Sequence, residues 1–175
     1  MRSEYPIGFW VLDWLWGIPM IAVSVVVHAV ALAFMGIAVA APAWQRFGKA
    51  QTHVSKAVVF IGVASGFGYC LALLHLFHAL VWAAAFVLLG AIGEFAQAID
   101  YSLTMIATVD NDGSAIKPEW RLMGGMEATA GMLLFGFSTA ALFGVMLRTW
   151  SLVTGPGEHD EEIGGPTSPS TSSQP

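Results

Sequence analysis

Charged residues are scarce in this sequence. They make up 11% of its 175 residues, while 56% are hydrophobic and the mean hydropathy is +0.68. Soluble domains carry about 25% charged residues, so the composition excludes an ordinary soluble protein and indicates a chain that lies in a lipid bilayer. No long hydrophilic module is present in the sequence. We therefore expect the protein to act within or beside the membrane, and its small size favours an oligomer.

Basic residues and cysteine are scarce as well. Seven Lys and Arg against twelve Asp and Glu give a formal charge of −5, and no basic patch is present, which argues against a nucleic-acid partner. Cys70 is the one cysteine, so an intramolecular disulfide is excluded and a packing role is favoured. No pairing of nucleophile and base, glycine-rich phosphate loop or Cys and His metal cluster is evident, so we do not expect an enzyme.

Long apolar runs give the organisation of the chain. We predict an all-α integral membrane protein with three transmembrane helices, because each run is long enough to cross a hydrocarbon core of about 30 Å. The predicted segments are an interfacial stretch at 1–16, a first transmembrane helix at 17–41 that stops at Pro42, a basic loop at 42–56, a long tilted helix at 57–93, a short helix at 95–107, a polar loop at 108–119, a third span at 120–150 and a disordered tail at 151–175.

Three basic residues orient the chain. Arg46, Lys49 and Lys56 lie close to both flanking spans, and such a cluster marks a cytoplasmic loop. We therefore expect the N-terminus outside, the polar loop at 108–119 outside, and the C-terminal tail in the cytoplasm. The expected location is the inner (plasma) membrane of the cell.

The short helix at 95–107 is apolar but too short to cross the bilayer, because about 13 residues span only about 20 Å. Such a segment enters the membrane and returns on the same side. Irregular backbone at membrane depth is tolerated only where it is buried in protein or lines a water-filled path. The stretch that follows, TVDNDG at 108–113, is therefore expected to line a water-filled path.

From about Leu74 to Trp150 the chain resembles the pore-loop ion channels of the two-helix potassium-channel type, in their small bacterial form. Members read A-x-Y/F-S-x-x-T-x-T-T-V-G-Y-G-D at the pore helix and filter. Here Tyr101, Ser102, Thr108 and Val109 match that pattern, and the segment WRLMGGMEATAGMLLFGFSTAALFGVM is similar to the inner helix. The resemblance implies an outer helix at 57–93, a pore helix at 95–107, a filter loop at 108–119, an inner helix at 120–150 with a hinge at Gly131 or Gly136, and a homotetramer.

The sequence departs from that family in the filter itself. Asp110, Asn111 and Asp112 replace its glycine, tyrosine and glycine, with Gly113 after them. Glycine serves where the backbone visits positive φ, which Asp tolerates far less readily, so a potassium filter of backbone carbonyls is not expected. In an extended stretch the two carboxylates point the same way. Four chains would then present two carboxylate rings, whose hard oxygens favour calcium, with magnesium as the alternative.

Two other interpretations of the same loop stay open. The EF-hand pattern D-x-[DN]-x-[DN]-G-x₅-E can be laid on Thr108, Asp110, Asp112, Gly113 and Glu119, although Thr108 fails its first position. Such a site would bind one calcium in each chain rather than one for four chains. A solvated turn closed by Gly113, with no ion at all, is the simplest alternative.

The apolar spans also contain ionisable residues, which are functional candidates by default in a membrane. His28 and His78 lie at similar depths, about 17 and 21 Å from the outer ends of their helices, and His75 shares a face with His78. Two such histidines can ligate haem, which gives a small electron-transfer protein as a rival function. Interhelical hydrogen bonding is their commoner use.

Three charged residues are assigned to the support of the pore. Asp100 lies in the N-terminal half of the short helix, where the helix dipole favours a carboxylate. Glu127 is one turn into the inner helix, where it can hydrogen-bond behind the filter or meet Arg121. The sequence as a whole predicts a tetrameric cation channel with an acidic, divalent-selective filter, with a non-conducting assembly subunit as the alternative.

Overall fold

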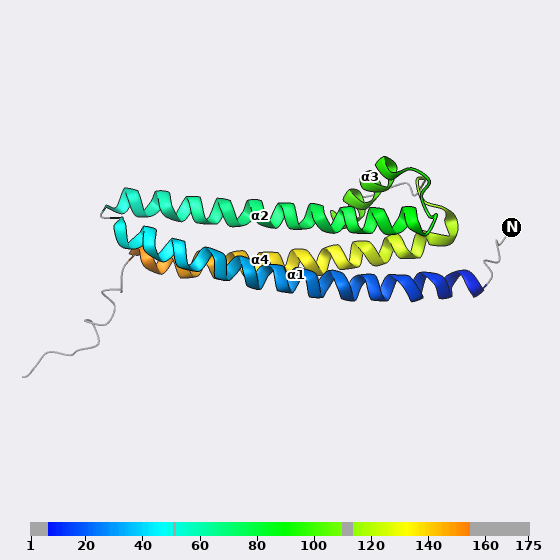
Figure 1. The fold of residues 1–175 in the computed structure, drawn as a ribbon, viewed down its shortest axis with the longest axis horizontal. Coiled ribbons are helices and arrows are strands. Elements are labelled where there is room, and N and C mark those ends of the chain that lie inside the picture. Colours follow the sequence, from blue (N-terminus) through cyan, green and yellow to red (C-terminus); the bar gives the residue numbers. More distant parts are fainter. Residues whose placement is uncertain (1–6, 51, 110–113, 155–175) are drawn as a thin grey trace, which may run out of the picture.

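The computed structural model describes residues 7–50, 52–109 and 114–154, and these are helical almost throughout. Three long helices lie side by side, and α1 and α4 run in one direction while α2 runs in the other (Figure 1). The helices are α1 (Ile7–Lys49), α2 (His53–Leu88), α3 (Phe95–Ile106), the short 3-10 helix η1 (Pro118–Trp120) and α4 (Arg121–Thr154). Three apolar stretches are long enough to cross a membrane: Val11–Val39 in α1, His53–Leu88, which is α2, and Pro118–Ser151, which runs from η1 into α4. The described part of the chain is therefore all-helical, with three helices that could span a membrane.

The first helix is longer than the sequence predicts. α1 is one continuous helix from Ile7 to Lys49, with Pro19 and Pro42 inside it. The separate interfacial segment at 1–16 is therefore not seen from Ile7 onward, and the expectation that Pro42 stops the helix was wrong. A proline inside a helix loses one backbone hydrogen bond. At Pro19, inside the apolar stretch Val11–Val39, any non-helical alternative in lipid would leave more polar groups unpaired, whereas Pro42 lies beyond that stretch.

The second helix begins four residues before its predicted start. Thr52 accepts a hydrogen bond from the Ser55 backbone N–H at 3.1 Å, and the Thr52 N–H donates to the Ser55 hydroxyl at 3.1 Å. This reciprocal pair satisfies N–H groups that the first turn leaves free. Because α1 ends late and α2 begins early, the polar connection predicted at 42–56 shrinks to residues 50–52, of which residue 51 lies outside the described part.

Two helices end in the same hydrogen-bonding motif with different residues at its critical position. After α2, Gly90 adopts φ +69°, its N–H donates to Val87 O at 3.0 Å, and the Ala91 N–H donates to Phe86 O at 2.8 Å. This is a Schellman motif, in which glycine suits the left-handed position, and it ends the helix before the predicted residue 93. α3 ends in the same motif with Thr108 at φ 54°.

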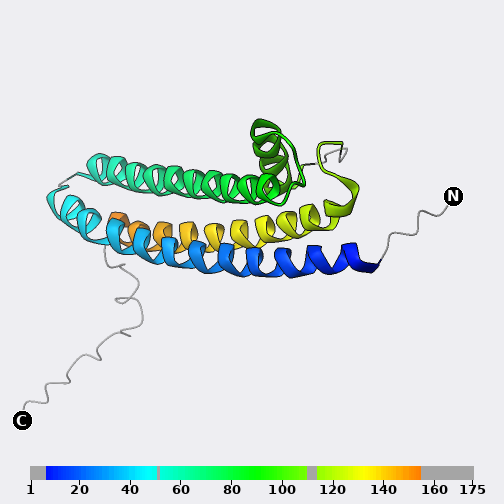
Figure 2. The ribbon, with the colours of Figure 1, turned by 45° about the vertical axis from the view of Figure 1, so that its right-hand side comes forward.

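The short helix α3 occupies the range expected for it and packs at one end of the bundle against α2 and α4 (Figure 2). One face, formed by Ala98, Tyr101, Ser102 and Ile106, is buried. The opposite face is exposed in a single chain. The main core lies here as well, and it includes Trp82, Phe86, Ile92, Tyr101, Ile106 and Met123.

Gly131 allows α3 to approach α4. A Cβ atom at this position would overlap the Ile106 carbonyl oxygen and lie 2.9 Å from the Ile106 Cα. Neither contact can be relieved by turning a side chain, because both atoms belong to the backbone. α4 is a continuous helix through Gly131 and Gly136, so the hinge role of either glycine stays a prediction, whereas the packing role of Gly131 follows from its contacts.

We expect Gly131→Ala to destabilise the protein and Gly136→Ala not to. The added methyl group at 131 overlaps the backbone, and overpacking of this kind costs about 1–3 kcal/mol. At Gly136 nothing lies within 4 Å of the position that the new methyl group would take, so alanine should be neutral or stabilise the helix by up to about 1 kcal/mol. Thermal unfolding of both variants in detergent micelles measures the difference. Equal melting temperatures would contradict the packing role.

Candidate functional site

The residues around the C-terminal end of α3 lead directly into the predicted filter. Thr108 donates its N–H to Met105 O at 2.9 Å, and Val109 donates to Thr104 O at 2.9 Å. Both residues are exposed in the single chain. Asp110, Asn111, Asp112 and Gly113, which carry the metal-binding prediction, lie outside the described residues. The structure therefore describes the backbone up to Val109, directly before this stretch.

Thr108 has an unusual backbone conformation. It is the one non-glycine residue with positive φ in the described part of the chain. A left-handed conformation costs an L-residue about 1–2 kcal/mol, and a β-branched residue is especially uncommon there. Strain of this kind concentrates at functional sites, where the surrounding structure holds it in place. The Schellman motif that ends α2 with Gly90 therefore ends α3 with a strained residue, Thr108, two positions before Asp110.

Behind α3 lies a buried carboxyl group. Glu127 of α4 is fully buried and faces Ser102 of α3 closely enough to interact with it. Neither Glu127 oxygen, nor the Ser102 hydroxyl, forms a hydrogen bond of good geometry among the described residues. The sequence placed Glu127 behind the filter, whose residues 110–113 lie outside the described part, and the structure places it against α3. Its predicted pairing with Arg121 remains a prediction.

Tyr101 fixes α3 between its neighbours. Its ring lies edge-on to Phe86 of α2, with 5.5 Å between centroids, and its hydroxyl occupies the space where a Cβ on Gly124 of α4 would be. Burial, together with the nearby Glu127 carboxyl group, raises the pKa of Tyr101 to about 12. The hydroxyl therefore stays protonated in any physiological medium.

The remaining predicted residues of this region are less enclosed. Asp100 is exposed, on the face of α3 opposite to the buried one. Glu119 is half-buried in η1, just before α4. Arg121 begins α4 and lies near enough to Tyr101 to influence its hydroxyl. Among the described residues no group of three His, Cys, Asp or Glu is arranged to hold a metal ion.

A second polar cluster lies in the middle of the bundle, where the three histidines meet. The His28 ring of α1 lies 5.3 Å from both the His75 and the His78 rings of α2, measured between centroids. The depth estimate from the sequence placed His28 and His78 at similar depths, where they could meet. The sequence did not reveal Ser138 of α4, whose hydroxyl lies 3.0 Å from both His28 Nε2 and His75 Nε2.

The hydrogen positions in this cluster are constrained by its geometry. A hydroxyl has one hydrogen to donate, so at least one of His28 and His75 must donate its Nε2–H to Ser138. The Nδ1 atoms of both rings are buried without a partner among the described residues. A buried lone pair costs less than a buried free N–H, which favours Nε2–H on both rings, each donating to the Ser138 oxygen.

His78 is held differently, by backbone oxygens. Its Nδ1 lies 2.8 Å from Leu74 O and its Nε2 lies 3.1 Å from Ser24 O, and the Trp82 indole N–H donates to the Ser24 hydroxyl at 3.2 Å. Carbonyl oxygens only accept hydrogen bonds, so the ring nitrogen must be the donor wherever it bonds to one of them. The Nε2 atoms of all three histidines thus point at oxygens of the protein, which supports interhelical bonding over haem ligation.

A third buried polar contact joins the first helix to the start of the last one. The Asp13 carboxylate of α1 is buried and interacts with the backbone N–H of Met123 in the first turn of α4. One turn later, Gly17 packs against Met126 so closely that a Cβ would overlap its sulfur. An acidic group at a helix N-terminus complements the helix dipole. α1 is therefore bound to α4 near its N-terminal end as well as at the histidine cluster.

No protein family matches this chain, and neither does any curated protein or solved structure. The resemblance to pore-loop channels therefore rests on the residues quoted above and on the order of the segments in the sequence.

We expect Ser138→Ala to destabilise the bundle by about 1–2 kcal/mol, since hydrogen bonds between membrane helices are worth roughly 0.6–1.7 kcal/mol each. The substitution leaves two buried ring nitrogens without an oxygen partner. Thr139→Ala is the matched control, because the Thr139 hydroxyl is exposed and bonds only to Phe135 O of its own helix. Thermal unfolding in detergent should separate the two variants. Equal stability would mean that the histidines find other partners at no cost.

Proposed function

We propose that the chain is one subunit of a homotetrameric cation channel in the inner membrane, with an acidic filter that favours divalent cations, calcium above all. The observation that carries the proposal is α3, a helix of 12 residues placed between two spans at one end of the bundle. At about 18 Å it is too short to cross the bilayer, and it leads directly to the two carboxylates Asp110 and Asp112.

The exposed face of α3 supports assembly into a ring. Gln97, Asp100 and Leu103 lie on it and are exposed in the single chain. Lipid tails cannot hydrogen-bond with Gln97, Asp100 or the backbone that follows α3, so this face requires protein or water against it. A ring of four chains provides both, with neighbouring subunits on one side and an aqueous path at the axis.

The exposed stripe of α4 supports its role as the inner helix. Along one face, at intervals of three and four residues, the exposed positions are Gly125, Thr129, Met132, Gly136, Thr139 and Phe143. This face lies opposite the buried positions Met123, Glu127, Ala130, Leu134 and Ser138. Small and hydroxyl-bearing residues recur on it, which suits a helix that lines a path for hydrated ions better than one that faces only lipid.

Electrostatics favours a divalent cation at the mouth. The C-terminal end of a helix carries a partial negative charge, and α3 ends four residues before Asp110. Carboxylates about 7 Å apart repel by roughly 2 kcal/mol per pair at an effective dielectric constant of about 20. Two rings of four carboxylates therefore require protons or cations to stay together, and oxygen ligands of irregular geometry suit calcium better than magnesium.

We expect the double substitution Asp110→Asn and Asp112→Asn to abolish divalent selectivity while the protein still assembles. It keeps side-chain size and removes up to eight charges per tetramer. Calcium affinity should fall at least tenfold, which corresponds to about 1.4 kcal/mol, and calcium flux should fall with it relative to sodium flux. The measurement is cation flux into liposomes with calcium, magnesium, sodium and potassium compared, together with calcium binding by calorimetry.

Three controls decide between the interpretations of the loop. Asn111→Ala should change little if the side chains alternate. Glu119→Gln should change little at an axial site but should weaken an EF-hand-like site, which would also bind four calcium ions per tetramer. Calcium binding without flux would favour the non-conducting assembly subunit. Unchanged binding and flux in the double Asp variant would contradict the proposal and leave the solvated turn.

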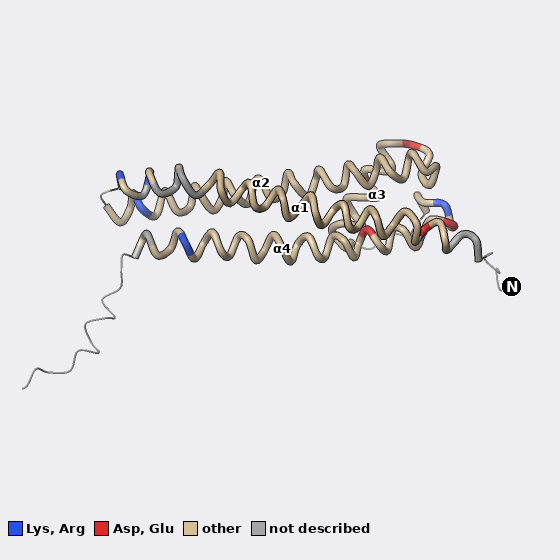
Figure 3. The backbone as a smooth tube through the Cα atoms, turned by 60° about the horizontal axis from the view of Figure 1, so that its bottom comes forward, with Lys and Arg blue, Asp and Glu red and all other residues tan. Residues whose placement is uncertain are grey.

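The orientation of the chain follows from its basic residues. Arg46 and Lys49 of α1 and Lys56 of α2 lie at the end where α1 meets α2, and Arg148 lies in the C-terminal part of α4. The described Asp and Glu, together with Lys117 and Arg121, lie toward the α3 end (Figure 3). By the positive-inside rule we propose that the α3 end faces outward.

With Cys70 replaced by Ser, a cysteine introduced at Ser3 should be labelled by a membrane-impermeant maleimide from outside only. Labelling only from the cytoplasmic side would reverse the assignment.

A further inference from the structure

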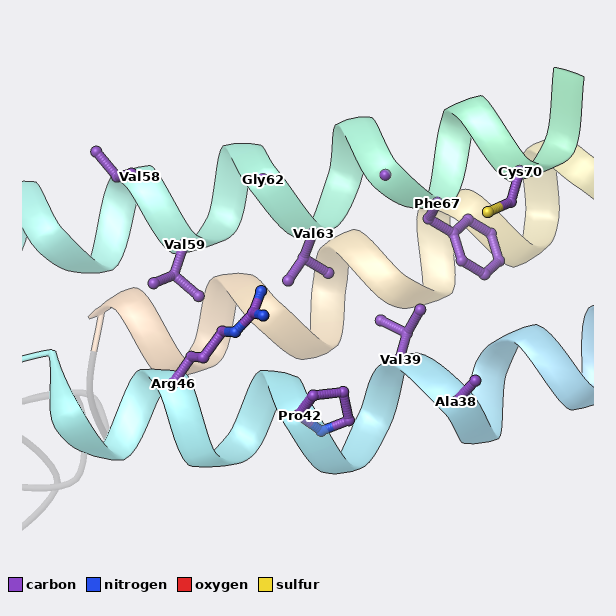
Figure 4. A pocket seen from close by; sticks show the side chains of 11 residues that line it. Ala38, Val39, Pro42, Arg46, Val58, Val59, Gly62, Val63, Phe67 and Cys70 are labelled. Carbon is purple, nitrogen blue, oxygen red and sulfur yellow. The ribbon is translucent and has the colours of Figure 1, made fainter.

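A groove between α1 and α2 lies toward the basic end of the bundle. It encloses about 520 Å³, and its walls are almost entirely apolar. The lining side chains include Val39 and Pro42 from α1 and Val59, Val63 and Phe67 from α2, with α4 passing behind them (Figure 4). From Val58 to Cys70 the groove extends about 18 Å along α2, which is close to the depth of one leaflet of a hydrocarbon core about 30 Å thick.

One charged side chain lines this groove. Arg46 extends from α1 into the space between the two helices, toward Val59 and Val63 (Figure 4). It forms no hydrogen bond or ion pair with the residues that the structure describes. It also lies seven residues beyond the end of the first apolar span at Val39, the level at which phospholipid headgroups are found. A guanidinium group there suits a phosphate, with which it can form two parallel hydrogen bonds.

Two glycines keep the groove open. Gly62 and Gly66 of α2 line it, and a Cβ built at either position meets nothing within 4 Å. A methyl group would therefore fit at these sites without disturbing the helix packing, and a larger side chain there would extend into the groove. The packing of the helices therefore does not require glycine at these two positions.

We propose that this groove binds an anionic glycerophospholipid of the cytoplasmic leaflet, with its phosphate on Arg46 and one acyl chain along Val59, Val63 and Phe67. Basic pockets between membrane helices on the cytoplasmic side bind anionic headgroups, and the apolar walls match an acyl chain in chemistry and length. The site is independent of the proposed channel, because none of its residues belongs to the filter or to the short helix.

Native mass spectrometry of the full chain in detergent, titrated with phosphatidylglycerol or phosphatidylcholine, tests the proposal. We expect phosphatidylglycerol to bind and phosphatidylcholine to bind at least fivefold more weakly. Arg46→Gln should weaken phosphatidylglycerol binding about tenfold, while Lys49→Gln, which removes the same charge from the same end of α1 outside the groove, should leave it within twofold. Equal effects of the two substitutions, or equal binding of the two lipids, would show annular association only and overturn the proposal.

A second pair of variants tests the acyl-chain position without changing any charge. Gly66→Val should fill the groove and weaken phosphatidylglycerol binding at least fivefold, whereas Gly68→Val, at another open position of the same helix outside the groove, should not. Unfolding temperatures of both variants establish that the fold is intact. Equal binding by the two variants would contradict the site. Disulfide-linked dimers through Cys70, which lines the groove, would instead identify a second copy of the chain as the occupant and overturn the lipid assignment.

Discussion

The arrangement of this protein depends on one close contact between backbones, where the carbonyl of Ile106 rests against Gly131. A side chain at that position would separate α3 from α4 and leave the last turn of α3 without its support. With glycine there, the short helix packs beside two long ones, and its buried face brings Tyr101 and Ser102 against Phe86, Gly124 and Glu127. This packing fixes where the acidic stretch begins, because the Thr108 and Val109 N–H groups donate to carbonyl oxygens in the last turn of α3.

Polar contacts hold an otherwise apolar bundle in register. Helices in lipid gain nothing from burying one apolar surface against another in place of lipid tails, so small residues and hydrogen bonds determine how they associate. α1 contacts α4 at three places: Asp13 with Met123, Gly17 with Met126, and His28 with Ser138. α2 joins the histidine cluster through His75, which bonds to Ser138, and through His78, which bonds to the Ser24 carbonyl of α1. The first helix, which lies outside the resemblance to two-helix channels, is thus an integral part of the bundle and contacts the helix that we propose lines the path.

The two ends of the bundle differ in chemistry, and the two proposals follow that difference. Carboxylates and strained backbone lie at the end that carries α3, where a site for a hard cation is proposed. Most of the described arginines and lysines lie at the other end, where an apolar groove opens beside Arg46 and an anionic lipid is proposed. A cation at one end and an anionic headgroup at the other are the ligands that the local charges favour, and neither proposal requires the other.

The sequence by itself determined the class of the protein and the number of its long helices, because runs of apolar residues longer than the bilayer is thick have few alternatives in any fold. It also located the short helix, because a dozen mostly apolar residues between two spans form a helix too short to cross the membrane. Helix ends were less predictable, since α1 continues through Pro42 and Thr52 caps α2 through a local pair of hydrogen bonds. Only the tertiary structure decided that Ser138 joins two histidines, that Gly131 is a contact surface and that Arg46 faces a groove. These relations link residues up to 110 positions apart, and they arise from helix rotation and crossing, which hydrophobicity alone does not specify when nearly every side chain is apolar.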